Sequence, residues 1–221
     1  MRRKRIKIFI LRKMPHLLLL ATLFSVSLLV GAYLPDQIPL HWDDFGVVDR
    51  IGTKYELIFL LPLAATAVFA AGAFAESRII LPSHKIRGFM SFMQFFFLVL
   101  FFVIQARNLL RAGHIWLPTE RLMAIPALLL YVYVGSMFYD AEYLSLFGIK
   151  TKWTLNSRIV WVRTNRLASR MFIICAALMV IPLFFYTYFY ILLTVPPVLS
   201  FIASVVYSKI ISRSAHDEDK E

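Results

Sequence analysis

The sequence is poor in the residues that build disulfide frameworks and soluble surfaces. It has one cysteine, Cys175, inside an apolar run, which excludes a disulfide framework and a thiolate metal site, and we expect Cys175 to be a small buried apolar residue. Charged residues make up only 17% of the 221 residues, whereas apolar residues make up 60%. These proportions exclude a soluble globular domain and are typical of a polytopic membrane protein.

Charged residues are also missing from the centres of the long apolar runs. No Asp, Glu, Lys, Arg or His falls near the middle of a predicted span, which argues against a proton-coupled pump. Gln94 is the strongest polar candidate inside a span, and Gln105 lies near the end of the same span. We expect helix-to-helix hydrogen bonds from them rather than transport, although a small transporter stays open as an alternative.

Six apolar runs are each long enough, at roughly 17 to 20 residues, to cross a hydrocarbon core. They lie at residues 17–34, 57–75, 88–104, 122–139, 171–189 and 191–207. The first run follows a cationic head, and we interpret it as an uncleaved span rather than a signal peptide. The last two runs are fused, and the tyrosines around Tyr188 predict an interfacial belt where the chain turns back.

The basic residues predict the orientation of these spans. Of the 24 lysine and arginine residues, 19 lie on the side of the N-terminus and five on the other side. This asymmetry places both termini in the cytoplasm. The fold class is therefore all-α, a polytopic membrane protein with six transmembrane helices in a bacterial plasma membrane. The net charge of +11 does not indicate direct nucleic-acid binding, because the basic residues cluster in loops between spans.

We divide the chain into five parts by their predicted function and by the side of the membrane on which they lie. The predicted parts are a cytoplasmic basic N-terminus (1–16), a first helical hairpin with an outward acidic loop at 35–56 (17–75), a second hairpin (76–139), a segment with a cytoplasmic basic stretch and the last hairpin (140–207), and a cytoplasmic acidic tail (208–221).

The stretch FGIKTKWTLNSRIVWVRTNRLASR, residues 147–170, is the only long segment between two spans that is both polar and basic. If it is helical, Arg163, Arg166 and Arg170 fall on one stripe. A basic amphipathic helix that leads into a span, with Trp153 just before it, would anchor the chain at a lipid headgroup layer.

Its first 21 residues resemble the signature of the SdpI family, Gly-Ile-Arg-Thr-Pro-Trp-Thr-Leu followed by Val-Trp and Thr-His-Arg. Lys150 stands for the arginine, Lys152 for the proline and Asn165 for the histidine. The resemblance implies a protein that gives immunity to a membrane-active toxin peptide and, as in the founding member of the family, captures a cytoplasmic transcriptional repressor. The partner-binding residues on this side would be Lys150, Trp153, Thr154, Trp161, Arg163 and Arg166.

The outward loop carries a second pattern. Its members are Pro35, Pro39, His41, Gly46, Asp49, Arg50 and Lys54. They resemble a domain of unknown function that often accompanies the SdpI signature, with the pattern Pro-x-x-x-Pro-x-His, then Gly-x-x-Asp-Arg and a lysine. Two motifs in this order identify the chain as a member of the SdpI family.

The chemistry of this loop is open from the residues alone. His41 beside Asp43, Asp44 or Asp49 offers ligands for a divalent ion or a pair for acid/base work, but no His-Glu-x-x-His motif and no matched nucleophile accompany them. Three interpretations stay open. These residues make structural turn contacts, or they bind a cationic or peptide ligand together with Arg50, or they catalyse a reaction. We expect no enzyme, no cofactor and no metal; a membrane hydrolase that uses His41 and the aspartates is the alternative.

Overall fold

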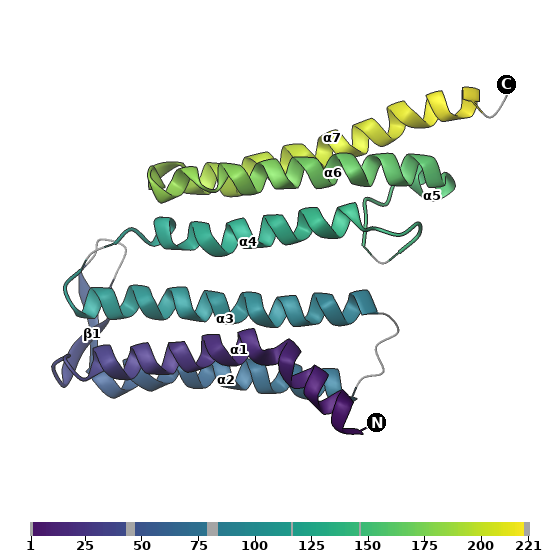
Figure 1. Cartoon of the computed structure of the whole chain (residues 1–221). Coiled ribbons are helices and arrows are strands. Elements are labelled where there is room, and N and C mark those ends of the chain that lie inside the picture. The colour runs from purple at the N-terminus through teal and green to yellow at the C-terminus, as the bar shows by residue number, and fades with distance from the viewer. Residues whose placement is uncertain (1, 43–46, 79–83, 116, 146, 219–221) are drawn as a thin grey trace. The chain divides into compact units, whose positions relative to one another are not determined.

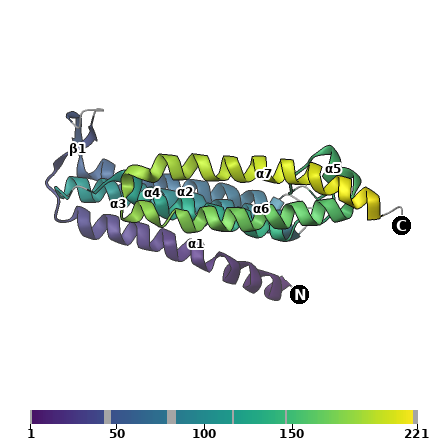
Figure 2. The same ribbon diagram turned by 90° about the horizontal axis from the view of Figure 1, so that it is seen from above.

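The structure is a computed structural model that describes residues 2–42, 47–78, 84–115, 117–145 and 147–218. The chain forms two compact units, an N-terminal unit (Met1–Thr119) and a C-terminal unit (Glu120–Glu221). Each unit is built mainly from three long helices, as Figure 1 and the turned view in Figure 2 show. Each is described separately below.

The N-terminal unit places a small β-hairpin between its first two helices. Its elements are α1 (Arg2–Gly31), β1 (Gln37–Trp42), β2 (Val48–Thr53), α2 (Lys54–Arg78) and α3 (His84–Ala112). The three helices pack on one another, and the hairpin lies at the end where α1 stops and α2 begins (Figure 1). The buried side chains of its two core clusters are Leu20, Leu23, Ala65 and Leu98, and Leu34, Ile38, Leu57, Leu109 and Ala112.

The hairpin is antiparallel, with Ile38 paired to Gly52 and His41 paired to Arg50. Ile38 is only 1% exposed and belongs to the second core cluster, so one face of β1 is tied to the helices. Register irregularities around His41 interrupt the ladder. The two strands lie within the predicted outward loop, and they are a small addition to the all-α fold that the composition predicted.

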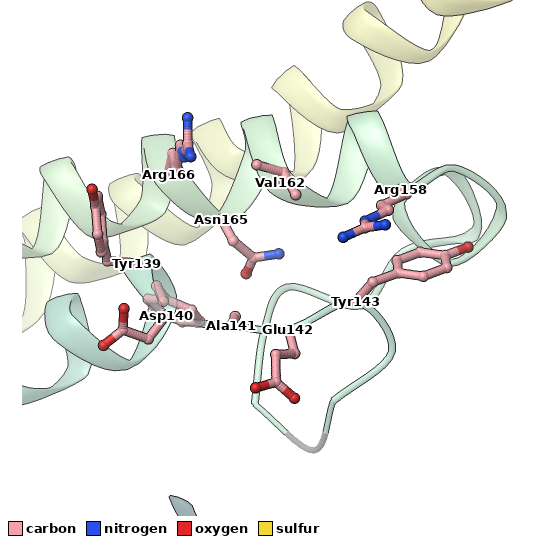
Figure 3. Close-up of a pocket in the computed structure, with 10 residues that line it drawn as sticks. Tyr139, Asp140, Ala141, Glu142, Tyr143, Arg158, Val162, Asn165 and Arg166 are labelled. Atoms are coloured by element: carbon pink, nitrogen blue, oxygen red, sulfur yellow. The ribbon is translucent and has the colours of Figure 1, made fainter.

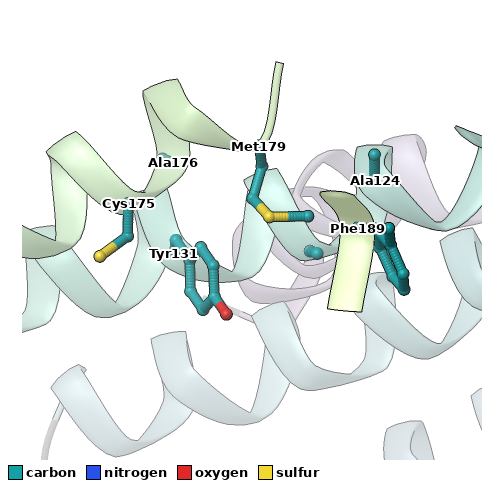
Figure 4. Packing of buried hydrophobic residues seen from close by; sticks show 7 residues of the cluster. Ala124, Tyr131, Cys175, Ala176, Met179 and Phe189 are labelled. Carbon is teal, nitrogen blue, oxygen red and sulfur yellow. The ribbon is translucent and has the colours of Figure 1, made fainter. Parts of the chain in front are cut away.

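The C-terminal unit consists of α4 (Thr119–Tyr139), the short α5 (Lys152–Asn156), α6 (Arg158–Leu178) and α7 (Phe189–Glu218), with two 3-10 turns, η1 (Ile181–Leu183) and η2 (Tyr186–Tyr188), between α6 and α7. Figure 4 shows its core, where small residues let the helices approach closely. The buried members are Ala124, Ala127, Tyr131, Cys175, Ala176, Met179 and Phe189. Cys175 is therefore a buried core residue, as predicted.

Six helical segments in the described residues are long and apolar enough to cross a membrane. They are Lys13–Gly31, Lys54–Glu76, Ile86–Ala112, Thr119–Tyr139, Arg158–Leu183 and Tyr186–Ser214. The prediction of six spans is confirmed, including the separate fifth and sixth spans. The turn between those two lies around η1 and η2, where aromatic side chains gather.

The predicted limits of the fifth span, 171–189, are wrong at both ends. The helix α6 begins at Arg158 and ends at Leu178. It begins early because the Ser157 hydroxyl caps it by accepting from the Val160 amide, and because its buried face continues unbroken through the basic stretch. It ends at Leu178, four residues before Pro182, because proline has no backbone N–H to donate to the Leu178 carbonyl.

Candidate functional site

A single buried tryptophan organises the segment between α4 and α6. Trp161, in the first turn of α6, is 0% exposed. Its indole N–H donates to the Ala141 carbonyl at 3.0 Å, and its ring meets the Tyr143 ring edge-on, with 5.9 Å between centroids. The chain that leaves α4 is therefore folded back onto α6 rather than left as an open loop.

Gly148 allows the returning chain to pass over that ring. It has φ +141, a backbone conformation that favours glycine, and a Cβ at this position would lie 2.5 Å from the Trp161 ring. The next residue donates its backbone N–H to Oδ1 of Asn165 at 2.8 Å, and the Asn165 amide donates to the Trp161 carbonyl at 2.9 Å. Asn165 is 1% exposed. Its side chain, at the position where the family signature has histidine, therefore holds the returning chain against α6.

The short helix α5 is fixed by a reciprocal capping box. The Thr154 hydroxyl accepts from the Thr151 amide at 2.8 Å, and the Thr151 hydroxyl accepts from the Thr154 amide at 3.2 Å. The Thr154 hydroxyl also donates to the Ile149 carbonyl at 2.8 Å. A contact of 3.0 Å between the hydroxyls of Thr151 and Ser208 joins this turn to α7.

These contacts leave a cavity of about 490 Å³ between the returning chain and α6 (Figure 3). One wall carries two carboxylates and the other carries two guanidinium groups. The lining residues are Phe138, Tyr139, Asp140, Ala141, Glu142, Tyr143, Arg158, Val162, Asn165 and Arg166. In Figure 3 the Arg158 guanidinium extends toward the Asn165 amide, whereas Arg166 lies at the rim.

The arginines of this region are available to a ligand. Arg158, Arg163 and Arg166 are exposed, and within the described residues none of the three forms an ion pair. Guanidinium groups prefer planar, bidentate recognition of carboxylates or phosphates. The cavity can therefore receive a ligand that presents negative groups to α6 and positive groups to the opposite wall.

The predicted partner-binding residues of this stretch divide into two groups. Lys150, Arg163 and Arg166 are exposed, and the half-buried Trp153 ring lies 5.1 Å from the Lys152 ammonium. Trp161 and Thr154 are both 0% exposed. Neither of these two side chains can touch a partner in this conformation; both position the backbone around the cavity.

Sequence reasoning did not single out the cavity residues Asp140, Glu142, Tyr143 and Arg158 as a site. The two carboxylates stand at the end of a span, where solvated charges are ordinary, so nothing local marked them. Two indications were available: Arg166, a predicted partner-binding residue that lines the cavity, and Asn165, which departs from the family pattern beside it.

The second predicted site lies on the β-hairpin. The Nδ1 atom of His41 is 2.7 and 2.9 Å from the two carboxylate oxygens of Asp49, with 66% and 45% of the side chains exposed. Arg50 pairs with Glu56 at 2.7 Å, next to that contact. Asp43 and Asp44 lie outside the described residues.

The described part of the hairpin thus holds an exposed His–Asp pair. The Asp49 carboxylate can hold the His41 ring in one orientation. Over the residues with described positions, no group of three or more His, Cys, Asp and Glu is arranged to hold a metal ion. The geometry therefore offers a polar, solvent-facing surface for a ligand.

Comparisons with known proteins agree with both motifs. Residues 144–208 match the SdpI/YfhL protein family, and residues 18–66 match a domain of unknown function, DUF1648. The chain is therefore similar to the SdpI/YfhL family over its C-terminal part. It is 24% identical over 162 residues to "Immunity protein SdpI" of Bacillus subtilis (strain 168), an alignment that covers 73% of this chain and 76% of that relative. No solved structure matches the chain.

The SdpI match covers α5, α6 and most of α7. It thus contains Trp161, Asn165 and the four exposed arginines Arg158, Arg163, Arg166 and Arg170. The DUF1648 match covers the hairpin with His41 and Asp49. The match to the SdpI/YfhL family and the six apolar helices of the described residues identify a multi-pass bacterial membrane protein.

Proposed function

We propose that this SdpI-like protein gives resistance to a membrane-active toxin peptide and that its cavity binds a cytoplasmic protein. The name of the Bacillus subtilis relative, an immunity protein, supports the first part. The observation that carries the second part is the cavity between the returning chain and α6, with carboxylates on one wall and exposed arginines on the other.

A polypeptide segment suits this cavity better than a lipid headgroup does. Anionic headgroups are attracted by clustered basic residues, but Asp140 and Glu142 on the facing wall oppose a purely anionic ligand. A protein segment can present acidic and basic side chains together and match both walls. A volume of about 490 Å³ admits several side chains of such a segment.

The partner we propose is a transcriptional repressor, as the family resemblance implies. The excess of lysine and arginine on one side of the spans predicts that the cavity opens to the cytoplasm, where a repressor is found. Capture at the membrane would hold the repressor away from DNA and so raise expression of the immunity protein.

On the opposite side, we propose that the hairpin is the surface that meets the toxin. The His41–Asp49 pair is exposed, and Arg50 and Glu56 add a second exposed pair next to it. Paired charges of both signs at a solvent-facing edge can bind a peptide by hydrogen bonds without a metal.

Charge reversal in the cavity tests capture separately from immunity. Arg158→Glu should abolish retention of the repressor at the membrane, whereas Arg170→Glu, on the same helix but outside the cavity, should retain it. The measurements are repressor-controlled reporter output and survival of a sensitive bacterium challenged with a panel of membrane-active peptides, at matched membrane levels. Equal retention by both variants would exclude the cavity, and survival no better than that of cells without the protein would exclude immunity.

A further inference from the structure

The N-terminal unit contains a buried polar cluster that none of the roles above uses. Lys13 of α1 is 1% exposed and its ammonium lies 2.7 Å from the Glu76 carboxylate of α2. The same ammonium donates to Oε1 of Gln94 on α3 and lies 3.4 Å from the Ser91 hydroxyl. Three helices thus meet around one lysine. This lysine is the first residue of the first span, whose other end leads into the hairpin.

This lysine fixes the orientation of the Gln94 amide. Because Oε1 accepts from Lys13, the NH2 group of Gln94 is directed to the other side, where it lies over Gly72 of α2. Gln94 is 7% exposed, and among the described residues its Nε2 has no hydrogen-bond partner. An unpaired donor in a hydrocarbon environment costs free energy until an acceptor reaches it.

The amide forms part of the wall of a crevice of about 260 Å³ between α2 and α3. The other lining side chains are apolar. The absence of a side chain at Gly72 lets the Gln94 amide lie against α2, because any Cβ there would collide with the amide. The complete lining is Val68, Gly72, Phe89, Met90, Met93, Gln94 and Phe97.

The depth of the crevice separates two possible occupants. Gln94 lies eight residues beyond Ile86, where the third span begins, which is about 12 Å along the helix axis. The polar headgroup layer of a bilayer accounts for only about 5 to 7 Å on each side. The ester groups of a lipid therefore lie above the Gln94 amide, whereas a peptide that crosses the membrane can bring an acceptor to its level.

We propose that this crevice binds one membrane-inserted peptide helix. The helix places a bulky apolar side chain between α2 and α3 and presents a hydroxyl or carbonyl oxygen to the Gln94 amide. A helix about 10 Å wide is too large to enter a crevice of about 260 Å³ as a whole, so one or two of its side chains fill the space. Lys13 and Glu76 act as positioning residues, because they hold the amide toward the crevice.

This inference rests on the proposed immunity function, which requires the protein to meet a membrane-active peptide. It places the binding site for that peptide within the membrane, at a site distinct from the hairpin and the cavity. Its test uses binding in vesicles, so that it can fail or succeed independently of bacterial survival.

The purified full chain is reconstituted in vesicles of phosphatidylglycerol and phosphatidylethanolamine with a photoreactive benzoylphenylalanine in place of Phe97, which lines the crevice. The matched control carries the same group in place of Phe59, an exposed α2 residue outside it. The probes are a synthetic leucine–alanine transmembrane helix with one serine at the depth of Gln94 and its serine-to-alanine twin.

We expect cross-linking to the serine peptide from position 97 and not from position 59. The serine peptide should exceed its twin by about threefold, as one hydrogen bond between membrane helices allows. Gln94→Leu should remove that preference, and Val68→Phe, which fills the crevice and leaves the amide in place, should reduce cross-linking of both peptides.

Three results would overturn the proposal. Cross-links from position 97 to lipid alone would make the crevice an acyl-chain site. Cross-links to a second copy of the chain alone would make it a dimer contact. Equal peptide labelling from positions 97 and 59 would show that the crevice does not bind the peptide. If the serine peptide binds at the crevice while cells expressing the protein remain sensitive, the binding site stands and the immunity function fails.

Discussion

The ammonium of Lys13 and the carboxylate of Glu76 form an ion pair of 2.7 Å, with only 2% and 1% of the two side chains exposed. The residues are 63 positions apart in the sequence. They join the start of the first span to the end of the second. A buried pair of this kind constrains how α1 and α2 pack, because separating it would leave two charges without water.

Removal of one partner should therefore destabilise the N-terminal unit more than removal of both. Lys13→Met removes the ammonium group from the buried Glu76 carboxylate, and we expect a loss of about 3 to 5 kcal/mol in unfolding free energy. The double variant Lys13→Met with Glu76→Met should recover most of that loss. Thermal unfolding of the detergent-solubilised protein measures both, with Lys209→Met as an exposed control. A single variant as stable as the parent would show that the pair is not a constraint.

Gly148 should tolerate no side chain. Gly148→Ala forces a Cβ against the Trp161 ring at a φ of +141, and strained backbone of this kind costs on the order of 1 to 3 kcal/mol before the collision is counted. Gly88→Ala is the matched control, because nothing lies within 4 Å of a Cβ there and alanine favours a helix interior. We expect lower thermal stability only in the first variant; equal melting temperatures would refute the role of Gly148.

Capture of a partner by the arginines near the cavity should depend on the planar shape of the guanidinium group as well as on its charge. Arg163→Lys with Arg166→Lys keeps the positive charge, so a pure lipid anchor would be unaffected. A protein partner that binds the planar guanidinium fork should be captured less well. Reporter output at matched membrane levels measures capture, and Arg170→Lys serves as the control outside the cavity. Unchanged output in the double variant would favour the lipid-anchor interpretation of this stretch.

The exposed pair of the hairpin should matter for protection but not for folding. Asp49→Ala breaks the contact with His41, and an exposed ion pair contributes only about 0.2 to 1 kcal/mol. We expect normal protein levels with reduced survival under toxin challenge. Asp36→Ala, which breaks the exposed contact with Lys54 at 2.9 Å, is the control. A parallel fall in abundance and survival would instead indicate a structural role for Asp49.

Reporter fusions should reveal the orientation of the spans. Fusions after residues 85, 155 and 215 should report a cytoplasmic location, and fusions after residues 45 and 115 the opposite side, because 19 of 24 basic residues lie on the predicted inner side. Each position is fused in turn to alkaline phosphatase and to green fluorescent protein. These two reporters are active on opposite sides of the membrane, so their activities show the side on which the position lies. A cytoplasmic signal after residue 45 would invert the roles assigned to the hairpin and the cavity.

The sequence by itself determined the features that depend on local composition. Six spans, the turn before α7 and the position of the hairpin follow from apolar runs and from clusters of turn and aromatic residues, because the bilayer imposes a fixed length on each crossing. The two family motifs were also visible in the residues. The helix-to-helix role predicted for the two glutamines agrees with the structure: Gln94 bonds Lys13, and Gln105 donates to Ser27 and to the Leu57 carbonyl, each at 2.9 Å.

Only the tertiary structure decided which polar residues are buried and which are available. Lys13 belongs to a basic run and Trp161 to a basic helix, so neither gives a local sign that it is enclosed. Lys13 is buried because Glu76 and Gln94 converge on it from two other helices, and Trp161 because the chain passes over it at Gly148. Such burial arises from contacts between residues distant in sequence, and the pattern of any single segment does not encode where its neighbours will lie.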